Sequence, residues 1–395
     1  MVILRRIHHV LALLRSTMAR IAMVVTNACS PDPRVIRHAK WLVQEGHEVT
    51  VHAFDRQIQF QKSELIDGVR IMRYHLGKTP YGGLINTALG LRNFVRQVQR
   101  GLANEPPEIV YCHDADTLEI GCRMKKNHKI PFVFDMHDLH HTWILMPAPN
   151  SLLRRIISKR LEKRMLHRIK SAKCIITSSG RLDENGVHSG FREYLAEKGH
   201  LSTVIENRPV IEHAVTEKAN TPWCIGYLGR VREVEPFEKL LQSVLSMEVE
   251  SRPCIRIAGD GIASERVRRL FENAQQEHGI QCQISGQFDS KRFTELIQEI
   301  DVMFAMYRPE RGNIMQGAIP VKMFDAAAWG VPSVVNSNCL MSEIAEKENI
   351  GTGVGWSDTV GLTQALIDLK SKSVQLNTGS ERERLKFVEA LTAVL

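Results

Sequence analysis

The feature that most constrains the fold of this chain is a regular alternation of short apolar runs with longer amphipathic segments. The runs RIAMVVT and VTVHAF have the length and composition of β-strands. The segment PRVIRHAKWLVQEGHE between them places four apolar side chains on one face of a helix: Val35, Ala39, Leu42 and Val43. A strand, a helix and a second strand in this order form a βαβ unit, which predicts a parallel sheet covered by helices.

The same alternation continues through PEIVYCH, PFVFDMH and KCIITSS, and it starts again at WCIGYLGR, after VIENRP. Two consecutive halves of this kind predict two Rossmann-like, doubly wound α/β domains that face each other across a cleft. We assign residues 20–207 to the first domain and 208–375 to the second. Residues 1–19 form a basic extension, and residues 376–395 form a helix that could pack back on the first domain.

The charge balance favours anionic partners without identifying one. Lys and Arg number 52 against 44 Asp and Glu, which gives a formal net charge of +8 at pH 7. Such an excess suits nucleotides, phosphates or an anionic membrane surface, and it is also common among ordinary globular proteins. We expect no nucleic-acid partner.

The eight cysteines are scattered along the chain and form no C-x-x-C pair. Most lie inside apolar runs such as SAKCIITSS, which favours small core residues in a reducing compartment over a disulfide framework or a zinc site. We therefore expect a cytoplasmic protein.

Two basic segments raise the question of contact with a membrane. No stretch approaches the roughly 18 apolar residues that span a bilayer. Residues 1–19 fit either a basic amphipathic helix lying on a membrane or a frayed extension. The segment LLRRIISKRLEKRMLHRIK, residues 152–170, would be drawn to an anionic leaflet if its Lys and Arg side chains share a face, and it fits a solvated helix face as well.

Ligands of doubly wound domains bind at the carboxyl ends of the parallel strands, so the residues after each strand are the first candidates. The sequence TNACSPDPRVIRHA after the first strand contains neither G-x-G-x-x-G nor a P-loop, which removes the main support for a dinucleotide oxidoreductase or a common ATPase. Asp32 and Pro33 fit a helix N-cap and a first-turn proline.

The strand that ends in FDMHDLHHTW carries a cluster of carboxylates and imidazoles. His137 and His141 have the spacing of a zinc-binding helix, but they follow a strand and no Glu comes after His137, so we expect no metal. A cleft histidine at position 137 that hydrogen-bonds a sugar hydroxyl or a developing charge is the favoured interpretation. A plain loop histidine is the alternative.

The second half offers an anion site. Gly229 would allow the backbone to approach a ligand, and Arg230 could donate two hydrogen bonds to a phosphate. Gly259 and Gly261 lie at another strand-to-helix turn, although any tight turn of this kind favours glycine. Ile319 and Pro320 precede a helix whose first turn carries Lys322, and Asp325 follows one turn later. Free N–H groups at such a helix start, together with the lysine, suit a diphosphate, and the carboxylate suits ribose hydroxyls. A charged helix start with no ligand is the alternative.

Seven segments in the same order and spacing resemble the retaining, nucleotide-sugar-dependent glycosyltransferases of family four, in the variant with a P-x-K donor motif. They are DPRVIRHAKWLVQEGHEVTV, FVFDMHD, IITSS, VIENRPV, IGYLGR, IAGDG and PVKMFDAAAWGVPSVV, and the resemblance extends from Arg20 to Leu369. It implies a GT-B fold and a UDP- or GDP-sugar donor held mainly by the second domain. It also implies transfer with retention and no required metal.

The resemblance assigns roles by position. His137 matches the histidine near the donor sugar, Arg230 the phosphate-binding arginine, Lys322 the lysine of the P-x-K motif and Asp325 the second glutamate of a paired motif. The acceptor, a glycan, a lipid-linked sugar or a small molecule, would lie on the first domain beside these residues: Asp32, Arg34, His113, Asp114 and Asp138. Such enzymes are hexosyltransferases, and polysaccharide biosynthesis at the inner face of a membrane is a typical setting. A homodimer is left open.

Three positions depart from the family pattern. Gly317 stands where the first glutamate of the paired motif contacts the donor sugar, Asp325 is a shortened second glutamate, and Glu235 replaces a basic residue near the diphosphate. These departures keep two other functions open, a nucleotide-sugar epimerase of GT-B fold and a degenerate binding or scaffold subunit.

Overall fold

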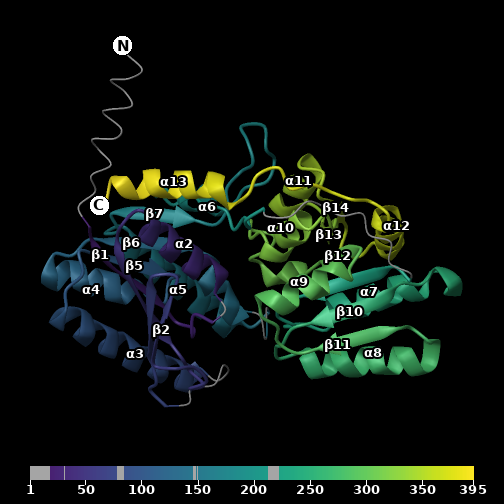
Figure 1. The fold of residues 1–395 in the computed structure, drawn as a ribbon, viewed down its shortest axis with the longest axis horizontal. Coiled ribbons are helices and arrows are strands. Elements are labelled where there is room, and N and C mark those ends of the chain that lie inside the picture. Colours follow the sequence, from purple (N-terminus) through teal and green to yellow (C-terminus); the bar gives the residue numbers. More distant parts are fainter. Residues whose placement is uncertain (1–17, 31, 78–83, 146–147, 149, 212–221) are drawn as a thin grey trace, which may run out of the picture.

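The structure is a computed structural model that describes residues 18–30, 32–77, 84–145, 148, 150–211 and 222–395. The predicted basic extension lies outside these residues except for its last two. Figure 1 shows two α/β domains side by side, as the sequence pattern predicts.

The first domain is built on an eight-stranded sheet in the order β3-β4-β2-β1-β5-β6-β7-β8 among the described residues. Its strands are β1 (Arg20–Val25), β2 (Glu48–Phe54), β3 (Ser63–Ile66), β4 (Val69–Tyr74), β5 (Ile109–His113), β6 (Phe132–Met136), β7 (Cys174–Thr177) and β8 (Thr203–Val204). Its helices are α2 (Pro33–Gln44), α3 (Leu84–Asn104), α4 (Leu118–His128), α5 (Leu152–Ile169) and α6 (Phe191–Glu197). Every residue of β5 and β6 is buried, because helices cover both faces of a parallel sheet.

In the described part of the second domain, six parallel strands form a sheet in the order β11-β10-β9-β12-β13-β14. Its strands are β9 (Cys224–Leu228), β10 (Cys254–Ala258), β11 (Cys282–Ser285), β12 (Val302–Ala305), β13 (Ser333–Asn336) and β14 (Gly351–Val354). Its helices are α7 (Glu235–Leu245), α8 (Ser264–His278), α9 (Ser290–Gln298), α10 (Val321–Ala328), α11 (Leu340–Lys347) and α12 (Thr359–Leu369). The strand order reverses between β9 and β12, so the turns that follow these two strands flank the binding crevice.

The last helix, α13 (Ser380–Thr392), leaves the second domain and lies across the first (Figure 1). Phe387 is fully buried there, with its ring centroid 4.5 Å from that of His38 and 5.3 Å from that of Trp41, both on α2. The core of the first domain therefore includes a segment from the far end of the chain.

Two local features differ from the sequence-based expectation. β3 pairs antiparallel with β4 through a turn in which Asp67 and Gly68 both have positive φ, the geometry of a tight hairpin. The expectation of eight free thiols is wrong for Cys224 and Cys254, which form a disulfide. The physical reason is their register, because they are directly opposite on neighbouring parallel strands, with Cα atoms 4.6 Å apart.

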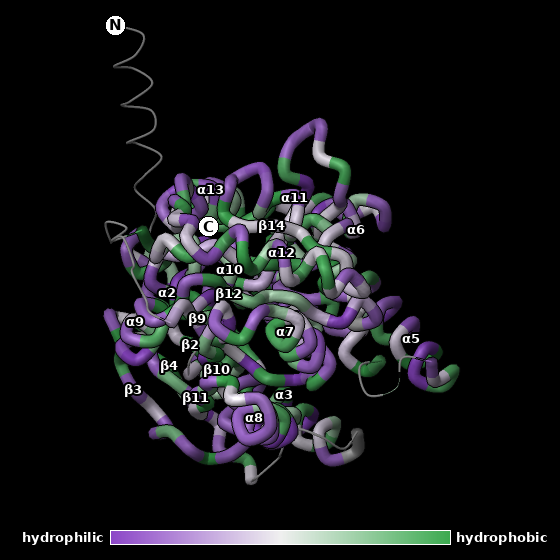
Figure 2. Tube along the Cα trace, turned by 90° about the vertical axis from the view of Figure 1, so that its right-hand side faces the viewer, coloured by the Kyte–Doolittle hydropathy of each residue, from purple (hydrophilic) through white to green (hydrophobic). Residues whose placement is uncertain are grey.

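Figure 2 shows hydrophilic and hydrophobic residues interleaved along the helices that surround the two sheets, as expected for amphipathic helices. Within the described part of the chain, no helix combines the length and the apolar character needed to cross a bilayer.

Candidate active site

A buried ion pair organises the first-domain side of the cleft. Asp135, near the end of β6, is fully buried, and Arg34 on α2 donates to it from Nε at 3.0 Å and from Nη2 at 2.6 Å. The remaining Nη1 of Arg34 donates to the carbonyl of Ile205 at 2.7 Å. Burial acts to raise the pKa of Asp135, but the Arg34 guanidinium holds that pKa well below its usual range. Arg34 thus fixes an anionic carboxylate beneath the cleft.

Three histidines and a tyrosine share the second oxygen of Asp135. His38 Nδ1 lies at 3.2 Å from it, His113 Nδ1 at 3.4 Å, His137 Nε2 at 3.1 Å, and the hydroxyl of Tyr111 donates at 3.3 Å. Burial lowers the pKa of both His38 and His113, so these two imidazoles are neutral at pH 7. This oxygen therefore has imidazole and phenol partners from three different elements.

His137 is the charged member of this group. Burial by itself would lower its pKa, but the carboxylates of Asp114 and Asp135 raise it to about 9. Asp114 accepts the backbone N–H of His137 at 3.1 Å and faces its Nδ1 at 3.5 Å. Burial raises the pKa of Asp114 to about 6. The His137 side chain retains 16% exposure, so an imidazolium lies at the rim of the group, between two carboxylates.

The atoms of His113, Asp135 and His137 lie close enough together to hold a metal ion, all within 4.8 Å of one another. Both oxygens of Asp135, however, already accept hydrogen bonds from the Arg34 guanidinium. A divalent cation would have to approach a carboxylate that a fixed positive charge already neutralises. The donor set therefore fits an ion-pair network better than a metal site.

The loop after β6 also joins the two domains. Asn313, in the loop between β12 and α10, is 2% exposed; its Nδ2 donates to Asp138 at 2.6 Å and its Oδ1 accepts the N–H of Leu139 at 2.9 Å. Asp138 is thus held at the domain interface, close in sequence to His137.

Asp32 has the structural role that the sequence left open. Its Oδ1 accepts the N–H of Val35 at 3.2 Å, so it caps α2, and its Oδ2 accepts from Asn27 at 2.8 Å. Both oxygens have partners within the first domain. The structure therefore brings Arg34, His113, Asp114 and His137 into one cluster, joins Asp138 to the interface and places Asp32 at a helix cap.

On the second domain, Lys322 lies against the turn that follows β9. Its Nζ is 3.1 Å from the ring centroid of Tyr227 and 5.7 Å from that of Tyr307. A Cβ at Gly229 would lie 3.3 Å from the same Nζ, so the turn and the lysine are in contact distance of each other. Arg230 is exposed on this turn, and its carbonyl accepts the Tyr227 hydroxyl at 2.8 Å. Two cations thus flank the crevice between β9 and β12.

Gly259 and Gly261 shape the neighbouring turn. A Cβ at Gly259 would lie 1.9 Å from the carbonyl oxygen of Gly229, and one at Gly261 would lie 2.0 Å from that of Val231. Both residues also have positive φ. Any side chain here would collide with the backbone of the β9 turn, so close packing between turns accounts for both glycines.

Asp325, one turn beyond Lys322, is half-buried, and burial raises its pKa to about 7. The guanidinium of Arg37, on α2 of the first domain, opposes this rise by lowering the pKa of Asp325. Burial lowers the pKa of the Arg37 guanidinium itself to about 10. Pro320 is the N-cap of α10 and Ile319 packs against the core, so these two residues form the start of the helix. Asp325 therefore interacts with both domains.

The structure explains the glycine at position 317. Gly317 has a φ of +106°, and a Cβ on it would lie 2.5 Å from the Cα of Gly190 and 2.7 Å from the carbonyl oxygen of Ser189. The backbone of the first domain occupies the space that a side chain would need. In this arrangement of the domains, a glutamate cannot stand here.

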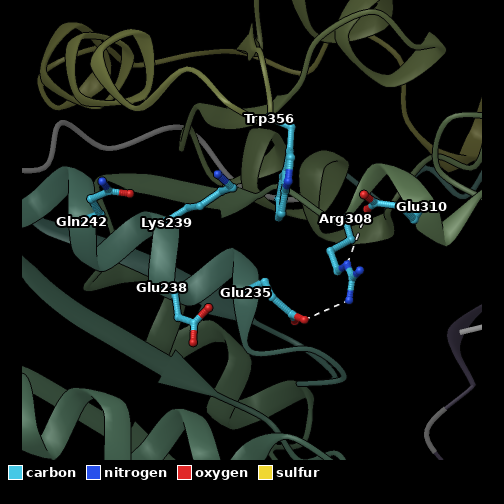
Figure 3. A pocket seen from close by; sticks show the side chains of 7 residues that line it. All are labelled: Glu235, Glu238, Lys239, Gln242, Arg308, Glu310 and Trp356. Carbon is cyan, nitrogen blue, oxygen red and sulfur yellow. Dashed lines mark hydrogen bonds and ion pairs between the residues drawn. The ribbon is translucent and has the colours of Figure 1, made fainter. Parts of the chain in front are cut away.

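Glu235, the other departure from the family pattern, is not an isolated charge. Its Oε1 pairs with Nη1 of Arg308 at 2.9 Å, and Arg308 also faces Glu310 at 3.4 Å (Figure 3). An unpaired carboxylate would repel a diphosphate, whereas this one is balanced by a guanidinium from the β12 side of the crevice.

The residues of this cluster lie within a segment that matches a known protein family. Residues 31–193 match the glycosyl transferase 4-like domain. The matched range contains the Arg34–Asp135 pair, the three histidines and Asp114. No curated protein matches the chain.

Solved structures extend the likeness beyond the glycosyl transferase 4-like domain to the second domain. Sucrose-phosphate synthase from Thermosynechococcus elongatus superposes with a TM-score of 0.70 at 15% identity, covering 95% of this chain and 96% of its own. The lipopolysaccharide outer core galactosyltransferase WaaB has a TM-score of 0.62 at 15% identity, with coverage of 95% and 100%. HepE from Anabaena, solved with UDP and glucose, has 0.58 at 13%, with coverage of 95% and 96%. At such identities the likeness concerns the fold, and the predicted GT-B fold is confirmed.

Several residues of the site were missed by sequence reasoning. They are His38, Tyr111, Arg37 and Asn313. Asp135 belongs to the cluster predicted in FDMHDLHHTW, but it was given no role of its own, although it interrupts the apolar strand FVFDM and a buried carboxylate in a central strand requires partners. The others act across elements far apart in sequence.

Proposed function

We propose that the chain is a retaining glycosyltransferase that moves a hexosyl group from a UDP- or GDP-sugar to an acceptor. The match of residues 31–193 to the glycosyl transferase 4-like domain and the GT-B fold support the reaction class. The observation that carries the proposal is the position of Lys322, in the first turn of α10 and beside the Gly229–Arg230 turn.

The departing nucleoside diphosphate would lie between these two turns. Lys322, Arg230 and the positive end of the α10 dipole would stabilise the negative charge that develops as the glycosidic bond breaks on the face where the acceptor attacks. Asp325 would accept hydrogen bonds from the ribose. Gly229 admits the diphosphate because no Cβ stands in its way.

His137 would contact the donor sugar from the first domain. Its Nε2 is held by Asp135, whereas its Nδ1 faces Asp114 at the longer distance of 3.5 Å. Exchange of this second contact for a sugar hydroxyl would leave the imidazolium oriented by Asp135. Asp114 and Asp138 lie beside it on the side proposed for the acceptor.

Replacement of Lys322 tests the proposal. We expect Lys322→Ala to lower the release of UDP or GDP from the sugar nucleotide by roughly two to three orders of magnitude, the effect of removing one preorganised charge partner. Lys372→Ala, an exposed lysine on the same domain, is the matched control. Wild-type turnover in Lys322→Ala, with unfolding temperature unchanged in both variants, would contradict the assignment.

Two other functions are separable by calorimetry with UDP-glucose and GDP-mannose. A scaffold subunit would bind neither nucleotide, and an epimerase would convert the bound sugar without an acceptor. The ion pair that balances Glu235 weakens one of the reasons to favour a degenerate protein. The packing at Gly317 accounts for the glycine but supplies no contact to the donor sugar.

We also propose that the acceptor is a glycan or a lipid-linked sugar met at the cytoplasmic face of a membrane. α5 lies at the edge of the molecule in Figure 2, with Leu152, Leu153 and Ile156 at its start 75%, 67% and 51% exposed. Exposed basic residues continue along the helix, namely Arg155, Lys159, Arg160, Lys163 and Arg164. Apolar anchors beside basic side chains fit an anionic leaflet.

Vesicle flotation tests this contact. Vesicles with 30% anionic lipid should carry the protein and zwitterionic vesicles should not, and Lys159→Glu/Lys163→Glu should abolish flotation. The control Lys291→Glu/Lys372→Glu carries the same charge change on the second domain and should float. Equal flotation of both double variants would contradict the α5 surface.

A further inference from the structure

A hollow of about 380 Å³ opens on the second domain between α7 and the loop that follows β14 (Figure 3). α7 supplies one wall, and Trp356 and Arg308 supply the other. Lys322, Gly229 and Asp325 are not among its lining residues, so it does not coincide with the proposed nucleotide site, and Glu235 is the residue that borders both. Because α7 begins at Glu235, shortly after the Gly229–Arg230 turn, the hollow opens near that site.

The wall formed by α7 is a stripe of polar side chains on one helix face. Glu235, Glu238, Lys239 and Gln242 follow the spacing of neighbours one turn apart, and all of them line the hollow. They offer carboxylate, ammonium and amide groups within the length of two helical turns. The wall therefore offers both hydrogen-bond donors and acceptors, with the two carboxylates nearer the start of α7.

The charges around the hollow do not favour an anion. Three glutamates, with Glu310 included, face one lysine and one arginine. The guanidinium of Arg308 is paired with Glu235 at 2.9 Å and faces Glu310 at 3.4 Å. A phosphate would meet a net negative wall, whereas a neutral ligand with several hydroxyl groups would find both donors and acceptors.

Trp356 gives the hollow a flat apolar surface. In Figure 3 its indole points toward α7, between Lys239 and Arg308. The ammonium group of Lys239 lies over one face of the indole, 5.0 Å from its centroid, so a sugar would stack on the face toward Arg308. Trp356 itself is half-buried against the domain core. The C–H face of a pyranose packs on an aromatic ring of this kind while its hydroxyls reach polar groups at the edge.

We propose that this hollow is a saccharide-binding groove for a neutral sugar unit of a glycan, with Trp356 as the stacking platform and Glu238 and Gln242 as hydroxyl partners. Its position beside the nucleotide site would let the groove hold a distal unit of the glycan whose end lies in the cleft. That last relation rests on the proposed function, but binding in the groove does not require turnover.

The experiment observes Trp356 directly. Protein labelled with 5-fluorotryptophan carries five fluorine reporters, one for each tryptophan, and Trp356→Phe assigns the relevant resonance. The probes are maltotetraose, cellotetraose, laminaritetraose and a linear mannotetraose, compared with inorganic phosphate and UDP. At least one tetrasaccharide should shift the Trp356 resonance saturably, and phosphate should not.

Two variants test whether the saccharide contacts α7 and whether its binding is independent of the nucleotide site. Glu238→Ala, an exposed side chain on α7, should weaken the tetrasaccharide by roughly fivefold or more through loss of a hydrogen bond, while the exposed Glu272→Ala on α8 should not. Lys322→Ala should leave saccharide binding intact even where it abolishes nucleotide turnover, which separates this inference from the proposed function. If the Trp356 resonance responds to no tetrasaccharide, or only to UDP or phosphate, the saccharide-binding proposal is wrong.

Discussion

At the scale of single residues, Gly317 sets how closely the two domains approach. Its backbone lies against Ser189 and Gly190 of the first domain, and its φ is one that side chains rarely adopt. A carboxylate introduced at this position would have to displace a turn of the other domain before it could reach a donor sugar.

We therefore expect Gly317→Glu to destabilise the protein by about 2–3 kcal/mol and to leave activity no higher than in the wild type. Urea unfolding and nucleotide release are the measurements. Gly286→Glu is the control, because a Cβ at Gly286 meets no atom within 4 Å and its φ is unstrained. Higher turnover in Gly317→Glu would show that the domains open far enough to admit the side chain.

The charge on His137 gives the stability a pH dependence with a definite sign. Its pKa is about 9 in the folded protein against 6.5 for an unperturbed histidine. The stabilisation is therefore fully present below about pH 6.5 and is lost as the pH rises toward 9. Asp114, Asp135, Arg34 and His113 are the titratable or charged groups that face the ring.

Unfolding free energies measured from pH 6 to 9.5 should fall by an amount on the order of 2 kcal/mol more in the wild type than in His137→Gln. The glutamine keeps a hydrogen-bond donor toward Asp135 but does not titrate. Parallel curves for the two proteins would contradict an imidazolium at this position.

At the scale of elements, α13 shows how a short helix can complete the core of another domain. Phe387 is fully buried against α2, whereas Leu385 on the same helix is 63% exposed. We expect Phe387→Ala to lower the free energy of unfolding by about 3–5 kcal/mol and Leu385→Ala by well under 1 kcal/mol. Denaturant titrations of the two variants check this pair. Equal losses would mean that α13 is not seated on α2.

The strands and helices were largely predictable because their residues follow local rules. The apolar runs of β1, β5 and β6 and the amphipathic face of α2 are visible in the sequence. The β3–β4 hairpin was predictable in principle from the pair Asp67–Gly68, whereas the disulfide depends on the register of two strands 30 residues apart.

The candidate site was predictable to a lesser degree. The position after a strand predicted His137, because parallel strands end at one edge of a sheet. The family resemblance added His113 and Asp114, at the end of the neighbouring strand β5. Asp135, which accepts hydrogen bonds from most of the cluster, lies inside a strand, and its main partner, Arg34, comes from a helix 101 residues earlier. Contacts of this separation are set by packing of the whole domain, which no local pattern encodes.

At the scale of the whole molecule, Arg208 ties the segment between the domains to the second domain. Its side chain is 4% exposed, pairs with Glu348 at 2.5 Å and Glu206 at 2.7 Å, and lies 4.4 Å above the ring of Phe324. A buried guanidinium with two carboxylates leaves uncompensated charge when it is removed.

Arg208→Met should therefore cost about 3 kcal/mol or more in unfolding free energy. The control is Lys347→Met, which breaks the Lys347–Asp183 pair between the same domains, where the side chains are 42% and 49% exposed, and it should cost under 1 kcal/mol. Chemical unfolding compares the two, and small-angle scattering should show a larger radius of gyration for Arg208→Met only. Equal costs would contradict the central role of Arg208.

The return of α13 has a consequence for anyone who would divide this protein. The chain passes between the domains twice, once before β9 and once after α12, so a single cut at the first passage produces no independent half. The upstream fragment would lack Phe387, which is buried in its core, and the downstream fragment would carry α13 with this apolar side chain exposed. Two co-expressed fragments should instead associate, because α13 of the downstream fragment can pack on α2 of the upstream one. Such a pair could serve as a split reporter that needs no added dimerisation domain.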